Sequence, residues 1–156
     1  MAALDRTDVG LLQALQEDGR RTIKELAAIV SLSSSATHDR VRRLFADGVI
    51  SGVHAELEPD AIGIGLQAVI QVALQRHSRE AVIAFRDHCL ALPEVLAVTH
   101  LTGAVDFLVH VAVRDTDHLR DLALEAFTTR DEVARLDTSV VYEHVPAVTW
   151  PIYLDT

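Results

Sequence analysis

Residues 22–50, TIKELAAIVSLSSSATHDRVRRLFADGVI, have the pattern of two short amphipathic helices joined by a tight turn. Thr22 and Glu25 form a capping box, in which each side chain accepts a hydrogen bond from the other residue's backbone N–H, so a helix is predicted to begin there. A serine-rich turn follows, and Ser33 or Ser34 can cap the second helix. The spacing therefore predicts a helix-turn-helix.

The second helix of this pair would carry three arginines within four residues, after a hydroxyl-rich first turn. Val41 and Leu44 have to face the core, so the serines and part of the basic surface face outward. Such a helix can enter the major groove of DNA and reach both base edges and phosphates. We therefore expect the DNA-contacting residues to be Thr22, Lys24, Ser33, Ser34, Ser35, His38, Arg40, Arg42 and Arg43.

These side chains are expected to have different roles. Arg40 and Arg43 flank the exposed face and suit phosphates, whereas Arg42 can bind either a guanine or a phosphate. Asp39 would be repelled by DNA unless it accepts from cytosine or pairs with a neighbouring arginine. The alternative is that these arginines only solvate an exposed helix. Their position on the second helix of a capped pair favours DNA.

The composition is that of a folded protein, with 49% apolar and 24% charged residues in a chain of 156. A net charge of −9 argues against a nucleic-acid partner, but residues 20–43 hold six basic and two acidic side chains. A basic face on an acidic body remains a workable DNA footprint. No apolar run is long enough to span a bilayer, and the start lacks a signal-peptide pattern, so we expect a cytoplasmic protein. The single cysteine, Cys89, excludes an intrachain disulfide and is expected in the core.

The chain is expected to divide near residue 64. A first helix is predicted at residues 5–17, and residues 1–50 would form the helix-turn-helix domain. Residues 49–57 alternate loosely and suggest a small two-stranded wing, so residues 51–64 are assigned to a wing strand and a linker. Residues 65–156 would form a second domain.

The second half has the patterns of alternating strands and helices. Strands are predicted at 66–75, 95–101, 107–113 and 133–145. Helices would follow Ser78, ending before Pro93, and Asp115 or Thr116. The order βαββαβ is a ferredoxin-like unit, which makes the chain an α+β protein with an N-terminal winged helix-turn-helix.

A ferredoxin-like unit has helices on one face of its sheet only. The other face would present the largely apolar set Val69, Ala73, Leu108, His110 and Ala112. This face needs cover, and sheet-against-sheet self-association is the simplest way to provide it.

The ordered series of motifs resembles the Lrp/AsnC, or feast/famine, regulators. The similar stretches begin with LDRTDVGLLQALQEDGRRTIKELAAIVSLS (4–33), RVRRL (40–44) and GVISG (48–52). They continue through LEPDAIGIGL (57–66) and ALPEVLAVTHLTGAVDFLVHV (91–111) to the final strand, which is nearly the whole chain. The resemblance implies a transcriptional regulator that binds double-stranded DNA and assembles as homodimers and often octamers. It also implies that an amino acid or a related small metabolite binds at contacts between effector domains.

Carried over to this sequence, the family's effector loop falls on residues 102–106. Gly103 would let backbone amides approach a ligand carboxylate, and Asp106 would meet an α-ammonium group or order the loop. The alternative for this loop is an ordinary hairpin turn. The resemblance implies effector contacts from Leu101, Thr102, Gly103, Ala104, Asp106, Leu136 and Thr138. Ala104 and Val105 depart from the acidic or aromatic residues frequent after the loop glycine, which favours a small or apolar effector.

Two rival functions remain open. Dimeric ferredoxin-like sheets also house small enzymes, but the sequence has no nucleophile–base pair and no metal-ligand spacing, and an enzyme would leave the helix-turn-helix unexplained. An amino-acid sensor that does not bind DNA is the other alternative. His100, His110 and His144 fall on predicted strands without converging, so no metal or other cofactor is expected. If histidines lie at subunit contacts, assembly would respond to pH.

Overall fold

The computed structural model describes residues 4–76, 78–147 and 149–153. The chain divides into two compact units, here called the N-terminal unit and the sheet unit. The N-terminal unit contains the residues up to Glu56 together with those from Val145 onward, and the sheet unit runs from Leu57 to His144. The tail from Val145 therefore packs with the helix-turn-helix, whereas the sequence analysis assigned it to the second domain.

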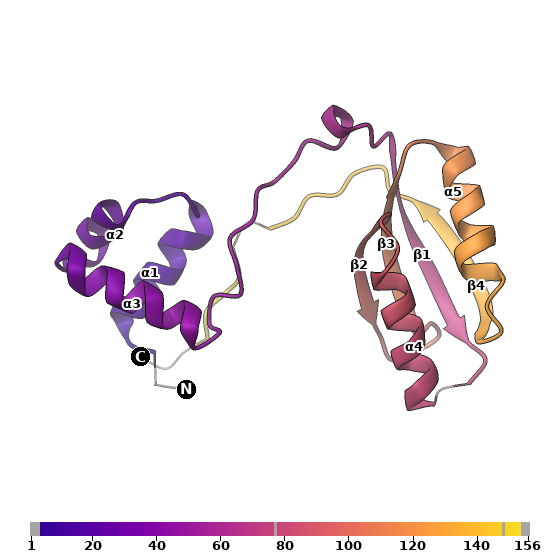
Figure 1. Ribbon diagram of the computed structural model, residues 1–156, viewed down its shortest axis with the longest axis horizontal. Coiled ribbons are helices and arrows are strands. Elements are labelled where there is room, and N and C mark those ends of the chain that lie inside the picture. Colours follow the sequence, from indigo (N-terminus) through magenta and orange to yellow (C-terminus); the bar gives the residue numbers. More distant parts are fainter. Residues whose placement is uncertain (1–3, 77, 148, 154–156) are drawn as a thin grey trace. The chain divides into compact units, whose positions relative to one another are not determined.

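The N-terminal unit is built from three helices, α1 (Arg6–Glu17), α2 (Ile23–Val30) and α3 (Ser34–Ala46), shown in Figure 1. Their starts are fixed by N-cap side chains: Asp5 accepts from the Asp8 amide, and Thr22 and Ser33 accept from the amides of Glu25 and Ala36. The predicted helix-turn-helix is confirmed. Its core consists of Leu11, Ala14, Leu26 and Leu44, each at most 4% exposed.

The predicted wing strand is not found. Residues 51–58, all within the described part of the chain, form no strand, and a 3₁₀ turn, η1 (Pro59–Ile62), follows them. The amides of Val49 and Ile50 both donate to the Leu44 carbonyl, at 3.0 and 3.1 Å, which closes the end of α3. These two side chains pack on the N-terminal core instead of starting a ladder, and the described residues of this unit contain no strand that could pair with them.

The sheet unit has the expected βαββαβ order. Its elements are β1 (Leu66–Leu74), α4 (Arg79–Leu90), β2 (Val95–His100), β3 (Phe107–Val113), α5 (Thr116–Leu122) with a π-helical continuation η2 (Ala123–Thr128), and β4 (Val133–Val140). The four strands form one antiparallel sheet in the order β2-β3-β1-β4. This arrangement confirms the ferredoxin-like fold class. The last strand is shorter than predicted: β4 ends at Val140, and β1, whose first residue Leu66 falls opposite residue 142 in this register, offers no partner for residues 143–145.

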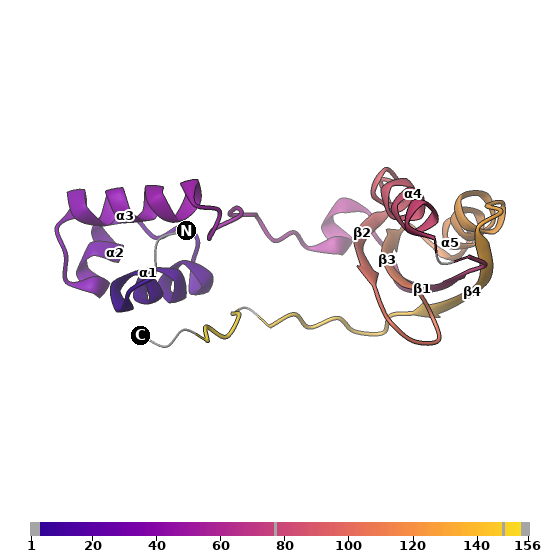
Figure 2. The same cartoon turned by 90° about the horizontal axis from the view of Figure 1, so that it is seen from below.

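The two faces of this sheet differ. Helices α4 and α5 both cover one face, as Figure 2 shows. Alternate residues of β1 and β3 point toward these helices and are fully buried with Phe85, Cys89 and Phe127, and the rings of Phe85 and Phe107 lie 4.9 Å apart. On the opposite face, Val69, Ala73, Leu108 and His110 are only partly buried. Among the described residues no helix is both long and apolar enough to cross a membrane.

Candidate DNA interface and effector site

The exposed face of α3 is defined by what the other face buries. Thr37 and Leu44 are buried against the core, at 0% and 1% exposure. With a period of 3.6 residues, the opposite side of the helix carries the residues expected at base edges. The exposed side chains there are Ser35, His38, Asp39 and Arg42. Ser34 is also exposed, at the start of the helix, but it lies one turn before Thr37 on the same side. His38 Nδ1 lies 3.8 Å from Asp39 Oδ1, and both side chains are exposed.

The sequence predicts that Arg40 and Arg43 extend toward DNA phosphates. In the structure both side chains are instead engaged by carboxylates of the N-terminal unit. Arg40 Nη1 donates to Asp5 Oδ2 at 2.7 Å and to Asp8 Oδ1 at 2.9 Å. Arg43 Nη2 donates to Asp8 Oδ2 at 2.7 Å. Because residues three apart on a helix lie on neighbouring surface positions, both guanidinium groups reach the start of α1. Both side chains therefore fasten α3 to the start of α1, and the expected phosphate contacts of Arg40 and Arg43 stay a prediction.

Asp8 is the centre of this cluster. Its side chain is 1% exposed, and it also accepts from the Asp5 backbone N–H, which completes a capping box at the start of α1. The Asp8 backbone N–H and the Arg40 guanidinium lower the pKa of Asp5, and the two carboxylates raise the pKa of Arg40 above its ordinary value. A buried carboxylate with two arginine partners is a strong structural constraint, because losing either side leaves an uncompensated charge.

The capping side chains are also engaged within the unit. The Thr22 hydroxyl donates to Glu25 Oε2 at 2.8 Å, and the Ser33 hydroxyl accepts from the Ala36 amide at 3.2 Å. The backbone N–H and the hydroxyl of Thr22, which both donate to the Glu25 carboxylate, lower the pKa of Glu25. Thr22 and Ser33 can therefore position the helix starts near a phosphate, while Lys24, which is exposed, remains available as a cation.

The six lysines and arginines from Arg20 to Arg43 fall into two groups. Arg21 pairs with Glu17 at 2.9 Å, and Arg40 and Arg43 pair as described above. Within the described residues, Arg20, Lys24 and Arg42 form no ion pair; of these three, only Arg42 lies on α3. The unneutralised charge that α3 presents is thus concentrated at Arg42.

The candidate effector loop joins β2 to β3. Residues 102–104 are exposed, and the loop is closed by a hydrogen bond from the Leu101 amide to the Asp106 carbonyl, at 2.8 Å. Gly103 has φ +124°, a backbone conformation that side chains with a Cβ rarely adopt, and nothing lies within 4 Å of where a Cβ would stand. Glycine is therefore required here by the backbone and not by crowding.

Asp106 supports the loop from inside. The residue is 8% exposed, and its Oδ2 accepts from the Leu74 amide at 2.7 Å while its own amide donates to the Val72 carbonyl at 2.8 Å. Of the two roles the sequence left open, these contacts match ordering of the loop. The side chain fixes the loop against the end of β1.

Leu136 and Thr138 lie apart from this loop. Both residues belong to β4, where Leu136 pairs with Val72 and Thr138 with Ile70 of β1. The loop leads into β3, and β1 lies between β3 and β4 in the sheet. Leu136 packs against the sheet-unit core, whereas Thr138 is exposed. Neighbouring strands lie about 4.8 Å apart, so two strand spacings separate these residues from β3. One ligand touching both groups would need a second copy of the chain or a reach across β1.

Neither the cysteine nor the histidines form a reactive cluster. Burial raises the pKa of Cys89 to about 12, which keeps the thiol protonated. His110 Nε2 lies 3.0 Å from Gln67 Oε1, and its ring lies 5.1 Å from that of His144. Within the described residues, no group of three or more His, Cys, Asp or Glu side chains is placed to hold a metal ion.

Sequence reasoning missed the partners of the α3 arginines. The signals were present in part: Asp5 and Asp8 have capping-box spacing, and Arg40 and Arg43 are three residues apart on one helix face. What the sequence lacked was the proximity of two segments more than thirty residues apart, since Arg40 and Asp8 are separated by 32 positions.

Comparison with known proteins assigns both units. Residues 4–44 match the AsnC-type helix-turn-helix domain family, and residues 67–150 match the Lrp/AsnC ligand binding domain family. The HTH-type transcriptional regulator AldR of Mycolicibacterium smegmatis is 41% identical over 142 residues, which cover 91% of this chain and 83% of that protein. DNA-binding transcriptional activator DecR of Escherichia coli is 37% identical over 112 residues, covering 72% of this chain and 74% of its own.

Solved structures agree with these matches over nearly the full length. A transcriptional regulator from Neisseria meningitidis, solved as a complex with L-methionine, superposes with a TM-score of 0.88 at 32% identity, covering 97% of this chain and 98% of that one. Escherichia coli AsnC superposes with a TM-score of 0.83 at 25% identity, covering 96% and 99%.

Proposed function

The chain belongs to the Lrp/AsnC family of transcriptional regulators, and on that premise we propose that it reads DNA through the exposed face of α3. It is a DNA-binding regulator that responds to a small molecule. The observation that carries the proposal is the surface of α3, where Ser35 and His38 precede Arg42 on the side opposite the buried Thr37 and Leu44, and Ser34 is exposed at the helix start. Within the described residues Arg42 forms no ion pair.

Each residue of the proposed interface has a distinct role. Ser34, Ser35 and His38 lie in the first turns of α3, where short polar side chains reach base edges. Arg42 follows one turn later and binds guanine or phosphate, while Lys24 and the N-terminal amides of α2 and α3, capped by Thr22 and Ser33, contact phosphates. Arg40 and Arg43 hold the helix in place and add charge at its flank.

We propose further that the effector is an amino acid or a related metabolite bound at the loop of residues 101–106. The L-methionine complex of the Neisseria relative supports this class of ligand. Exposed amides around Gly103 suit a carboxylate, and Leu136 and Thr138 would complete the site from another copy of the chain, because β1 separates them from the loop within one copy. The effector would act by favouring one assembly over another.

Self-association follows from the same geometry. The open sheet face presents Val69, Ala73, Leu108 and the buried Ala112 without a covering layer in one chain. We propose that a second copy covers it, giving a dimer that meets a pseudo-palindromic DNA site with two copies of α3, and that dimers join into larger assemblies, up to octamers. The protein would act in the cytoplasm without catalysing a reaction.

The proposal is tested by selecting duplexes from a random-sequence pool with the wild-type protein and measuring their affinity with and without each of the twenty amino acids. If the selected duplexes share a consensus, and one amino acid changes the protein's affinity for it, both specific DNA binding and an amino-acid effector are supported. A consensus indifferent to all twenty would leave DNA binding in place and reject an amino-acid effector. Binding without a consensus, steeply weakened by salt, would favour the non-DNA sensor.

Gly103 provides a location test for the effector. Changing Gly103→Ala imposes a strained φ of +124°, and we expect it to weaken amino-acid binding by about tenfold while DNA affinity without effector stays within about twofold. Gly63→Ala is the matched control, since Gly63 also has positive φ (82°) and open space around it but lies outside the loop. Isothermal titration of both variants measures the difference. Equal losses would place the ligand elsewhere.

The pKa of His110 predicts how stability depends on pH. Burial, and then the neighbouring His144, lower this pKa below 6.5. As the pH falls through about 6.5, the unfolded chain binds a proton that the folded chain resists, so stability is expected to fall on acidification. In His110→Gln the free energy of unfolding should fall less between about pH 7 and pH 5 than it does in the wild type. Urea unfolding at each pH measures this difference. His54→Gln, an exposed histidine, is the control and should keep the wild-type profile.

A further inference from the structure

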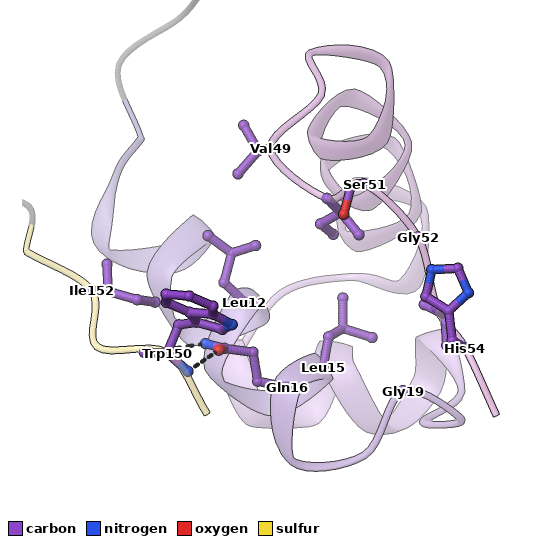
Figure 3. A pocket seen from close by; sticks show the side chains of 12 residues that line it. Leu12, Leu15, Gln16, Gly19, Val49, Ser51, Gly52, His54, Trp150 and Ile152 are labelled. Atoms are coloured by element: carbon purple, nitrogen blue, oxygen red, sulfur yellow. Dashed lines mark hydrogen bonds between the residues drawn. The ribbon is translucent and has the colours of Figure 1, made fainter. Parts of the chain in front are cut away.

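A hollow of about 490 Å³ lies in the N-terminal unit beside α1. Leu12 and Leu15 of α1 line the hollow, together with Trp150 and Ile152 of the C-terminal tail (Figure 3). Val53, in the segment that follows α3, also lines it. This hollow has no part in the α3 surface or the effector loop. It is where residues from the two ends of the chain meet.

The tail is held there by one side chain of α1. The Trp150 amide donates to Gln16 Oε1 at 2.5 Å, and Gln16 Nε2 donates to the Trp150 carbonyl at 3.4 Å, drawn as dashed lines in Figure 3. A side-chain amide that meets both backbone groups of one residue binds main chain as a neighbouring strand would. The Trp150 residue stays 84% exposed, so the attachment does not depend on burial of its ring.

This attachment gives α1 a second link to the sheet unit, made of covalent chain as far as Trp150 and closed by the hydrogen bonds to Gln16. The first is the segment between α3 and β1, and the second is the segment between β4, which ends at Val140, and Trp150. The nine intervening residues, 141–149, reach roughly 30 Å at full extension. While Trp150 is docked, the end of β4 and α1 cannot separate by more than this short tether permits.

We propose that the C-terminal tail is a strap that transmits the effector state from β4 to α1 through Gln16. This rests on the proposed function, in which Leu136 and Thr138 of β4 contact the effector. Coupling requires an element with two states that both sites bias, and a tail docked by two neutral hydrogen bonds, one of them long, can be held or released. At the other end, α1 carries Asp5 and Asp8, which hold α3.

The test compares Gln16→Ala with Gln13→Ala in the full chain. Gln13 is one turn earlier on α1 and lies beside the same tail residues, but among the described contacts it forms no hydrogen bond to Trp150. Hydrogen exchange of residues 149–153 reports docking. DNA affinity with and without the most active of the twenty amino acids reports coupling, on a duplex selected by the wild-type protein.

We expect Gln16→Ala to exchange about tenfold faster in the tail and its DNA affinity to change less than about twofold when the amino acid is added, with amino-acid binding retained. Gln13→Ala should keep the wild-type response. Unchanged tail exchange in Gln16→Ala would overturn docking, and a full response despite faster exchange would overturn coupling. A wild-type protein that binds DNA but responds to no amino acid would instead reject the proposed function, and coupling with it.

Discussion

Changing Arg42→Ala is expected to weaken specific DNA binding by about 1–3 kcal/mol per half-site, roughly 5- to 150-fold in Kd. The reason is that Arg42 is the α3 arginine left without a carboxylate partner within the described residues. Its removal takes away an exposed guanidinium without opening the core. Fluorescence anisotropy with a selected duplex at fixed salt measures the loss, and the free energy of unfolding should stay within about 0.5 kcal/mol of wild type.

Two further variants interpret that result. Arg86→Ala is the matched control, because Arg86 is an exposed arginine of the sheet unit paired with Asp87, and its loss should leave DNA affinity unchanged. The salt dependence separates the two roles of Arg42: a lost phosphate contact lowers the slope by about one per arginine, whereas a lost base contact relaxes sequence preference. If Arg42→Ala keeps wild-type affinity and specificity, the proposal that α3 contacts DNA through Arg42 is wrong.

Changing Asp8→Ala is expected to destabilise the N-terminal unit by about 3–5 kcal/mol. The carboxylate is 1% exposed and accepts from Arg40, Arg43 and the Asp5 amide, so its loss leaves the Arg43 guanidinium and the Asp5 amide without this acceptor, and leaves Arg40 with Asp5 alone. Such a cost is a large fraction of a domain's total stability. DNA binding should be lost as a consequence of unfolding and not through a lost contact.

Hydrogen exchange in urea, read by mass spectrometry, checks this effect unit by unit. Peptides from α1 and α3 should exchange at lower urea in Asp8→Ala, while peptides from β1 and β3 should keep wild-type protection, because the two units have separate cores. Asp39→Ala is the control: this carboxylate lies on the exposed side of α3, with His38 as its partner at 3.8 Å. If Asp8→Ala unfolds like Asp39→Ala, the buried cluster contributes nothing to stability.

Much of the fold was predictable because its signals are local. The capping box at Thr22 and Glu25, the Ser33 and Ser78 caps and the alternation along residues 66–74 are each written within a few neighbouring positions. Local hydrogen bonding and periodic burial set these elements regardless of what packs against them. The connection between the strands predicted at 95–101 and 107–113 was also expected, and Gly103 within it has a backbone conformation that other residues rarely adopt; its role in effector binding stays a prediction.

The errors share the opposite cause. Residues 49–57 had a strand-like pattern, but a strand exists only with a partner, and Val49 and Ile50 instead close α3 onto its core. Likewise β4 ends at Val140, and the last residues of the predicted strand, 143–145, lie beyond the end of β1, its partner strand. Pairing is a property of two segments, so one segment's pattern sets neither its presence nor its length.

By itself the sequence determined the helix-turn-helix, the βαββαβ order and the exposed face of α3, because periodicity and caps act between near neighbours. The family followed from the resemblance of the ordered series of motifs. Only the tertiary structure decided which arginine is free. Arg40 and Arg43 meet carboxylates 32 and 35 positions away, and Gln16 meets Trp150 134 positions away. Charge pairing and tail docking depend on distance in space, which folding sets and a linear pattern does not record.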